Sequence, residues 1–190
     1  MRETGLRPWL PVIFLDRDGT LIRDRGHLAD PARVELLPGV GEALALLNRH
    51  GFPVAVVTNQ SGIGRGWITL KDYLRVEAAL EQTLADMGAR VDVTMFCPDP
   101  PGVTSTRRKP AAGMFLEAAQ ALGRTPQGGV FVGDRLRDVE AARLFGGEGW
   151  LLATGHPAER PPAPWIRRAP SLVEVVTSVV ERYVEGKGSR

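Results

Sequence analysis

Short apolar runs alternate along the chain with segments whose apolar residues recur at helical spacing. The apolar runs predict strands at Val12–Leu15, Val54–Val57, Val91–Phe96, Val130–Val132 and Gly149–Leu152. The periodic segments predict helices at Gly39–His50, Leu70–Met87, Ala111–Leu122, Leu136–Phe145 and Ser171–Val184, the last with Ser171 as its N-cap. Repeated strand–helix units predict an α/β fold, a doubly wound (Rossmann-like) parallel sheet with helices on both faces.

The connections between these elements leave no room for a second folded unit. Stretches rich in Pro and Gly at Pro98–Arg108 and Gly155–Pro164 predict surface loops. The intervals from Thr20 to Thr58 and from Thr58 to Lys109 hold a helix with a loop or a strand, so we expect no cap domain and an open site. We therefore expect a single domain over residues 1–190, with flexible ends at 1–8 and 185–190.

Composition and charge narrow the class of protein. Lys and Arg total 24 against 22 Asp and Glu, a net charge of +2, which does not indicate a membrane or nucleic-acid partner. The single cysteine, Cys97, cannot form an intramolecular disulfide, which favours a reducing compartment. No apolar run reaches the ~18 residues of a membrane helix. We expect a cytoplasmic monomer.

Polar residues cluster where the predicted strands end. Asp16 to Thr20 (DRDGT) follows the first strand, Thr58-Asn59-Gln60 follows the second, and Gly133-Asp134 follows the fourth. Since the carboxyl ends of parallel strands share one edge of a sheet, these three clusters converge where ligands of such sheets bind.

This combination suits phosphoryl transfer to a carboxylate. Asp16, held where a buried strand stops, can attack phosphorus and form an aspartyl phosphate. Asp18 can protonate the leaving oxygen and later take a proton from water. Mg²⁺ would offset the negative charge, with Asp134 as a further ligand. Lys109 and the Thr58 hydroxyl can bind the phosphoryl group.

Four motifs carry a resemblance to a known family: DRDGT at 16–20, VVTNQSG at 56–62, RKP at 108–110 and GDRLRD at 133–138. In this order they resemble the motifs of the haloacid dehalogenase-like phosphatases. The stretches TNQSGI and FCPDPPG before RKP resemble the heptose-bisphosphate and histidinol-phosphate phosphatase branch.

The resemblance implies roles for further residues. It implies that Mg²⁺ is held by Asp16, the backbone carbonyl of Asp18 and Asp134, while Asp138 supports these ligands or is a minor ligand. It also implies that the following residues approach the substrate: Asp24, Arg25, Gly26, His27, Asn59, Gln60, Ser61, Gly62, Arg108 and Arg135.

The chain departs from that branch at the loop before RKP. Relatives carry a zinc loop there, a Cys-x-His followed by a Cys-x-Cys. Here Cys97 is followed by Asp99, and Arg107 stands where a further cysteine is expected. One cysteine cannot build a tetrahedral zinc site, so we expect a zinc-free loop and draw no substrate preference from it.

Structural roles remain open for several residues. The alternatives are Asp134 as a cap of the helix from Leu136, Thr58 as an ordinary strand threonine, Lys109 as an exposed loop lysine, His27 as a surface residue, Arg107 and Arg108 as a solvated pair, and Cys97 as a small buried residue.

The sequence predicts a Mg²⁺-dependent phosphomonoesterase acting on a small metabolite, a sugar phosphate such as heptose 1,7-bisphosphate, in carbohydrate metabolism. A histidinol-phosphate phosphatase and a polynucleotide 3′-phosphatase are the alternatives among enzymes. The alternative outside enzymes is a phospho-accepting signalling module, although such modules usually place the acceptor after the third strand.

Overall fold

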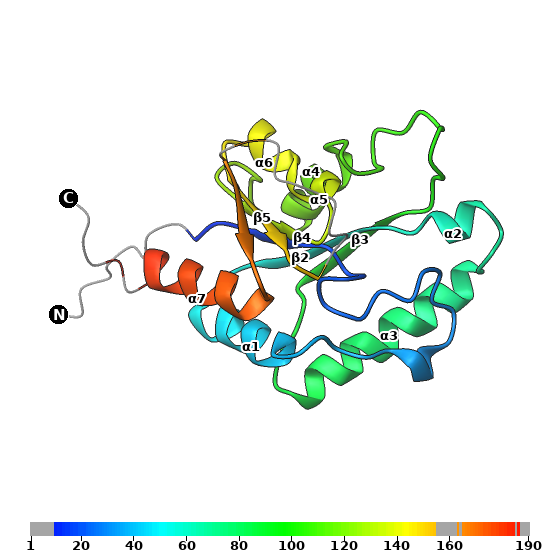
Figure 1. The fold of residues 1–190 in the computed structure, drawn as a ribbon, viewed down its shortest axis with the longest axis horizontal. Coiled ribbons are helices and arrows are strands. Elements are labelled where there is room, and N and C mark those ends of the chain that lie inside the picture. Colours follow the sequence, from blue (N-terminus) through cyan, green and yellow to red (C-terminus); the bar gives the residue numbers. More distant parts are fainter. Residues whose placement is uncertain (1–9, 155–162, 164, 185, 187–190) are drawn as a thin grey trace.

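Six strands form one parallel sheet in the computed structural model of the chain, which describes residues 10–154, 163, 165–184 and 186 (Figure 1). The strands are β1 (Ile13–Leu15), β2 (Val54–Asn59), β3 (Val93–Cys97), β4 (Val130–Gly133), β5 (Glu148–Leu152) and β6 (Ile166–Ala169). Their order across the sheet is β3-β2-β1-β4-β5-β6. Ile13 of β1 pairs with Val54 on one side and Val130 on the other, so β1 lies at the centre.

Helices cover both faces of the sheet, as the sequence predicted. Figure 1 shows α1, α3 and α7 on one face and α4, α5 and α6 on the other. The bounds are η1 (Pro31–Arg33), α1 (Val40–His50), α2 (Ser61–Gly64), α3 (Leu70–Asp86), α4 (Gly113–Ala121), α5 (Leu136–Val139), α6 (Ala141–Leu144) and α7 (Leu172–Tyr183). The predicted doubly wound α/β fold is confirmed.

The central strand is buried on both sides. Ile13 and Leu15 join the larger apolar cluster, under α1, α3 and α7, while Phe14 points to the smaller cluster under α4. There the Phe14 and Phe131 rings stack with centroids 4.8 Å apart. Apolar packing holds β1 from both faces. Asp16, the residue that follows β1, is therefore attached to a rigid strand.

Several local features differ from the expectation. The segment predicted as one helix over Leu136–Phe145 is two short helices, and Arg143 N–H donates to Glu140 O three residues earlier, a tightened turn at the junction. The edge strand β6 was missed because its two middle residues, Arg167 and Arg168, are exposed and leave no apolar run. Ser171 occupies the N-cap position of α7, although its side chain makes no capping hydrogen bond.

The other expectations about chain organisation concern a cap domain, membrane helices and the chain ends. In the described residues no cap is inserted between β1 and β4. None of the described helices combines the length and apolar character that a bilayer span requires. The predicted flexible ends and most of the Gly155–Pro164 loop lie outside the described residues.

Candidate active site

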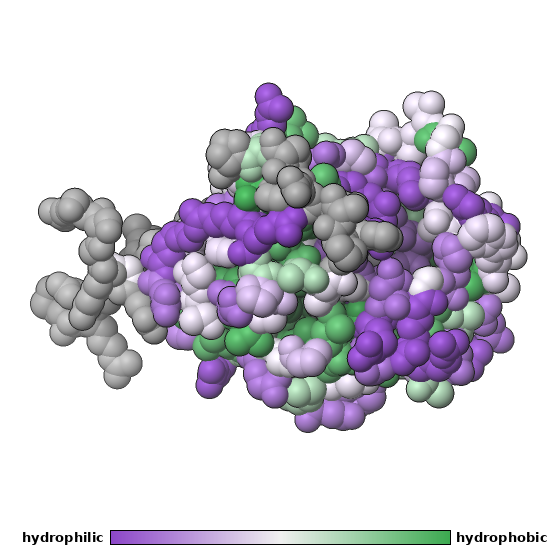
Figure 2. All heavy atoms as spheres, viewed as in Figure 1, coloured by the Kyte–Doolittle hydropathy of each residue, from purple (hydrophilic) through white to green (hydrophobic). Residues whose placement is uncertain are grey.

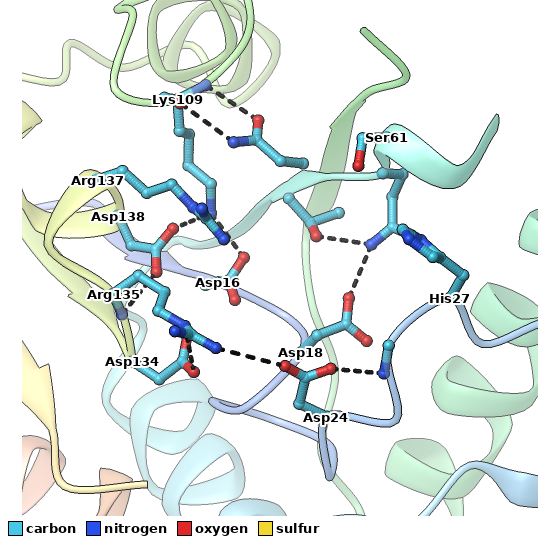
Figure 3. Close-up of a pocket in the computed structure, with 14 residues that line it drawn as sticks. Asp16, Asp18, Asp24, His27, Ser61, Lys109, Asp134, Arg135, Arg137 and Asp138 are labelled. Atoms are coloured by element: carbon cyan, nitrogen blue, oxygen red, sulfur yellow. Dashed lines mark hydrogen bonds and ion pairs between the residues drawn. The ribbon is translucent and has the colours of Figure 1, made fainter. Parts of the chain in front are cut away.

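Asp16 directly follows β1, and its carboxylate meets the Lys109 ammonium (Figure 3). Lys109 Nζ lies 2.6 Å from Asp16 Oδ1, 2.8 Å from Asp138 Oδ1 and 2.6 Å from Val57 O. Burial alone would lower the pKa of Lys109, but the Asp138 and Asp16 carboxylates hold it above its ordinary value. Lys109 is only 3% exposed, so it is not an exposed loop lysine.

Three carboxylates converge beside this lysine. Oxygens of Asp16, Asp134 and Asp138 lie within 4.8 Å of one another. Burial, and then repulsion from Asp16 and Asp138, raise the pKa of Asp134 to about 7. Negative charge is therefore in excess here, and carboxylate oxygens are the donors that Mg²⁺ takes. The cluster fits a divalent cation.

Asp138 is held at both oxygens. Its Oδ1 meets Lys109, and its Oδ2 accepts the Arg135 backbone N–H at 3.0 Å, at the start of α5. Asp138, rather than Asp134, is therefore the aspartate bonded to the start of that helix. Asp138 positions Lys109 against Asp16 while leaving Asp134 directed toward the cavity.

A turn at Gly19 lets the loop that follows β1 pass close to the Asp134 side chain. Gly19 has a φ of 82°, in the region that favours glycine. A Cβ at this position would overlap the Asp134 carboxylate. The Gly in DRDGT is thus needed both for the turn and for the approach of Asp134.

Asp18 lies on the other side of the cavity. Its Oδ2 accepts a hydrogen bond of 2.8 Å from Gln60 Nε2 and one of 3.0 Å from an Arg17 guanidinium nitrogen. Gln60 also donates to Thr58 Oγ1 at 2.9 Å. Burial raises the pKa of Asp18, with Arg17 opposing the shift. A carboxyl group with a raised pKa is suited to donate a proton.

Asn59 braces the segment that carries the lysine. Its side-chain amide donates to Lys109 O at 3.2 Å, and its Oδ1 accepts the Lys109 backbone N–H at 3.0 Å. This pair links β2 to the loop before α4. Asn59 was predicted only as a substrate contact, and the structure adds this bracing contact.

One cavity collects nearly all the predicted site residues (Figure 3). Those that line it are Asp16, Asp18, Asp24, Gly26, His27, Thr58, Asn59, Gln60, Ser61, Lys109, Asp134 and Arg135. Asp138 and Arg137 also line it. Sequence reasoning missed Arg137, although the spacing of GDRLRD, which puts it two residues after Arg135, was an available signal.

Three predicted substrate residues do not line this cavity: Arg25, Gly62 and Arg108. Arg25 instead donates to Glu35 Oε2 at 2.5 Å, so its guanidinium is already paired. Arg108 donates to the backbone oxygen of Asp99 at 2.7 Å. Burial first, and then the nearby charges of Arg137 and Arg65, lower the pKa of Arg108. Arg108, Arg137 and Arg65 therefore form a group of neighbouring arginines, of which Arg137 lines the cavity.

The loop around Cys97 is held by hydrogen bonds. The buried Cys97 thiol donates to Asp99 Oδ2 at 3.4 Å and lies 3.8 Å from Ser105 Oγ. Ser105 Oγ in turn accepts the backbone N–H groups of Arg107 and Arg108 at 3.2 and 3.0 Å. These contacts agree with Cys97 as a small buried residue.

Comparisons with known proteins agree with this geometry. A family model described as haloacid dehalogenase-like hydrolase matches residues 23–146. The chain belongs to this family. It is 39% identical over 158 residues to the D-glycero-beta-D-manno-heptose-1,7-bisphosphate 7-phosphatase of Mesorhizobium japonicum, covering 76% of the chain and 70% of that protein. The Yersinia pestis protein of that name is 34% identical over 185 residues, covering 92% and 97%.

A solved structure is also similar. The D,D-heptose 1,7-bisphosphate phosphatase of B. bronchiseptica, complexed with magnesium and phosphate, has a TM-score of 0.84 and 31% identity, covering 91% of this chain and 99% of that one. The predicted enzyme class, a phosphatase of the haloacid dehalogenase-like family, is confirmed. Enzymes of this family generally depend on Mg²⁺, in agreement with the acidic cluster.

Proposed function

We propose that this enzyme is a Mg²⁺-dependent phosphatase that removes one phosphate from a sugar bisphosphate, of the kind named for its relatives, through an aspartyl phosphate. The observation that carries the proposal is Asp16 at the end of β1, paired with Lys109 and within 4.8 Å of Asp134 on the wall of a cavity. This arrangement supports Asp16 as the nucleophile, Lys109 as a phosphate-binding group and the carboxylates as a cation site.

The first half of the reaction makes the covalent intermediate. A carboxylate oxygen of Asp16 attacks phosphorus, and the bond from phosphorus to the sugar oxygen breaks. Asp18 gives its proton to that oxygen, so the sugar leaves as an alcohol. Lys109 and Thr58 would bind the phosphoryl oxygens during this step.

The second half releases phosphate. The Asp18 carboxylate takes a proton from water, whose oxygen attacks phosphorus, and the bond to Asp16 breaks. Asp16, the backbone carbonyl of Asp18 and Asp134 would hold the metal. When bound, Mg²⁺ offsets the repulsion between these carboxylates and the phosphate dianion.

The group of neighbouring arginines favours a second anionic group on the substrate. Arg108, Arg137 and Arg65 are close enough for the charges of the last two to lower the pKa of Arg108. A guanidinium can bind phosphate through two hydrogen bonds at once. A bisphosphate would place its second phosphate here, which supports a bisphosphate rather than a monophosphate.

The deciding experiment is a panel of phosphorylated metabolites ranked by kcat/KM with Mg²⁺. We expect heptose 1,7-bisphosphate to rank above sugar monophosphates, histidinol phosphate and a 3′-phosphorylated oligonucleotide. Continued turnover of p-nitrophenyl phosphate separates an enzyme from a signalling module, which would be labelled once. A panel led by histidinol phosphate would reject the sugar bisphosphate but retain the phosphatase.

The same proposal covers assembly and compartment. We propose a monomeric enzyme in the cytoplasm, and the single cysteine, which cannot form an intramolecular disulfide, supports that compartment.

A further inference from the structure

A buried polar chain reaches Asp18 from the opposite side to the cavity. The Arg17 side chain is fully buried and lies between Asp18 and Glu77, a residue of α3. Arg17 contacts Asp18 Oδ2 at 3.0 Å and Glu77 Oε2 at 3.4 Å. Glu77 Oε1 accepts a hydrogen bond of 3.0 Å from Thr94, a residue of β3. The chain Thr94–Glu77–Arg17–Asp18 thus joins β3 and α3 to the loop after β1.

Apolar packing alone does not explain why the Arg17 side chain is buried. A guanidinium taken out of water is costly unless carboxylates pair with it. Here the pairing uses one carboxylate from each side, and the Tyr73 ring lies 5.3 Å from the guanidinium carbon. Glu77 is itself only 8% exposed. In the described residues Asp18 and Glu77 are the two carboxylates that pair with Arg17, so the buried guanidinium links Glu77 to Asp18.

These contacts make the two oxygens of Asp18 unequal. Oδ2 receives Gln60 at 2.8 Å and two Arg17 nitrogens at 3.0 and 3.2 Å, whereas Oδ1 receives a single contact of 3.2 Å. An oxygen that already accepts three donors has little capacity to hold a proton as well. Oδ1 is therefore the oxygen of Asp18 that is freer to carry a proton toward the leaving group.

We propose that Glu77 is a positioning residue for proton transfer by Asp18, acting through Arg17; this inference rests on the proposed function. Glu77 anchors Arg17, and Arg17 with Gln60 holds Oδ2, so that Oδ1 is the oxygen presented to the leaving group. Without the Glu77 charge, Arg17 can turn about Asp18, and the proton is no longer aimed at the sugar oxygen.

The test uses the dependence of rate on the leaving group. An alkoxide must be protonated as it leaves, whereas p-nitrophenolate leaves readily without a proton. If the Asp18 carboxyl group is no longer oriented toward the leaving oxygen, kcat/KM for a sugar phosphate falls far more than kcat/KM for p-nitrophenyl phosphate. A variant damaged only in its packing would lower both by the same factor.

The variant is Glu77→Gln, which keeps the shape and removes the charge. We expect kcat/KM for heptose 1,7-bisphosphate to fall about tenfold or more, but by less than the roughly 10²–10⁴-fold worth of the general acid itself. The fall for p-nitrophenyl phosphate should be less than about threefold. The matched control is Glu81→Gln, the same change on an exposed residue one turn further along α3, which should alter neither value.

A second variant, Thr94→Val, provides the test if Glu77→Gln does not fold. Thr94→Val is close in shape and removes only the hydrogen bond that orients Glu77, so its effect should be smaller and have the same selectivity. It decides the matter if melting curves show that Glu77→Gln is unfolded. Equal losses for both substrates, or no loss, in a folded variant would overturn the inference. If the wild type and Glu81→Gln turn over neither substrate, the proposed function fails instead.

Discussion

The floor of the cavity and its rim differ in how firmly their side chains are held. On the floor Lys109, Asp134 and Asp138 are 3–4% exposed. Lys109 pairs with Asp138, which also accepts a backbone N–H, and Asp134 lies 3.4 Å from the Arg135 guanidinium. On the rim Asp24, Gly26 and His27 line the cavity and are exposed. Hydrophilic residues gather on the right of the view in Figure 2, the side toward which the strands run in Figure 1. The floor is built for one chemistry, while the rim is left free to select substrates.

The largest expected effect comes from replacing Asp16, the proposed nucleophile on the floor of the cavity. Asp16→Asn should abolish turnover of p-nitrophenyl phosphate and of the sugar bisphosphate alike, because a neutral amide cannot attack phosphorus. The fold should persist, since β1 is held by packing on both faces. Steady-state kinetics beside a circular dichroism spectrum measures both. Wild-type-like turnover in a folded Asp16→Asn protein would end the covalent mechanism.

Removal of metal should have nearly as large an effect. A chelator should stop turnover of every substrate, and added Mg²⁺ should restore it, because the acidic cluster belongs to the floor and not to the rim. Elemental analysis should find no stoichiometric zinc, since Cys97 is the only cysteine. One tightly bound zinc per chain would contradict our interpretation of the Cys97 loop.

The pH dependence of metal binding tests the electrostatics of the floor. The pKa of Asp134 is raised from 3.8 to about 7, so a proton competes with Mg²⁺ below that pH. Affinity for Mg²⁺ should fall by up to about tenfold per pH unit below pH 7, measured by titration calorimetry.

The same shift affects the metal-free protein in a defined direction. Because the raised pKa favours the protonated folded state, stability from Asp134 is complete below pH 3.8 and is lost as pH rises toward about 7. Asp134→Asn should remove this part of the dependence of the melting temperature on pH. An unchanged pH profile in that variant would show that Asp134 is not the group responsible.

Arg108→Ala should distinguish substrate binding at the rim from the chemistry on the floor. If Arg108 holds the second phosphate, its loss costs about 1.5–3 kcal/mol, the worth of a charge-assisted hydrogen bond, in kcat/KM for the bisphosphate. The loss should be much smaller for p-nitrophenyl phosphate, which presents nothing to a distal arginine. Equal losses would place Arg108 on the transferred phosphate, and no loss with either would return it to the solvated surface.

The same contrast explains what the sequence could predict. Asp16, Thr58 and Asp134 were found because each lies at or directly after the end of a buried strand, and parallel strands bring such positions to one edge. The Glu77–Arg17 contact could not be found, since it depends on which face of α3 turns toward β1 across 60 residues. Likewise, β6 was missed because an edge strand need not have a continuous apolar run. Local pattern specifies strand ends, whereas pairings across the fold depend on packing.

The smallest expected effect concerns the arginine that the structure directs away from the cavity. Arg25 and Arg23 both pair with Glu35 at the surface, and exposed pairs of this kind contribute about 0–1 kcal/mol. Arg25→Ala should therefore change kcat/KM for the bisphosphate by less than about twofold, since the charge removed is already paired elsewhere. It is the matched control for Arg108→Ala, because both changes remove one guanidinium near the site. A loss as large as that of Arg108→Ala would mean that the loop at residues 24–27 exchanges Glu35 for the substrate. Arg25 would then contact the bound substrate, as the sequence predicted.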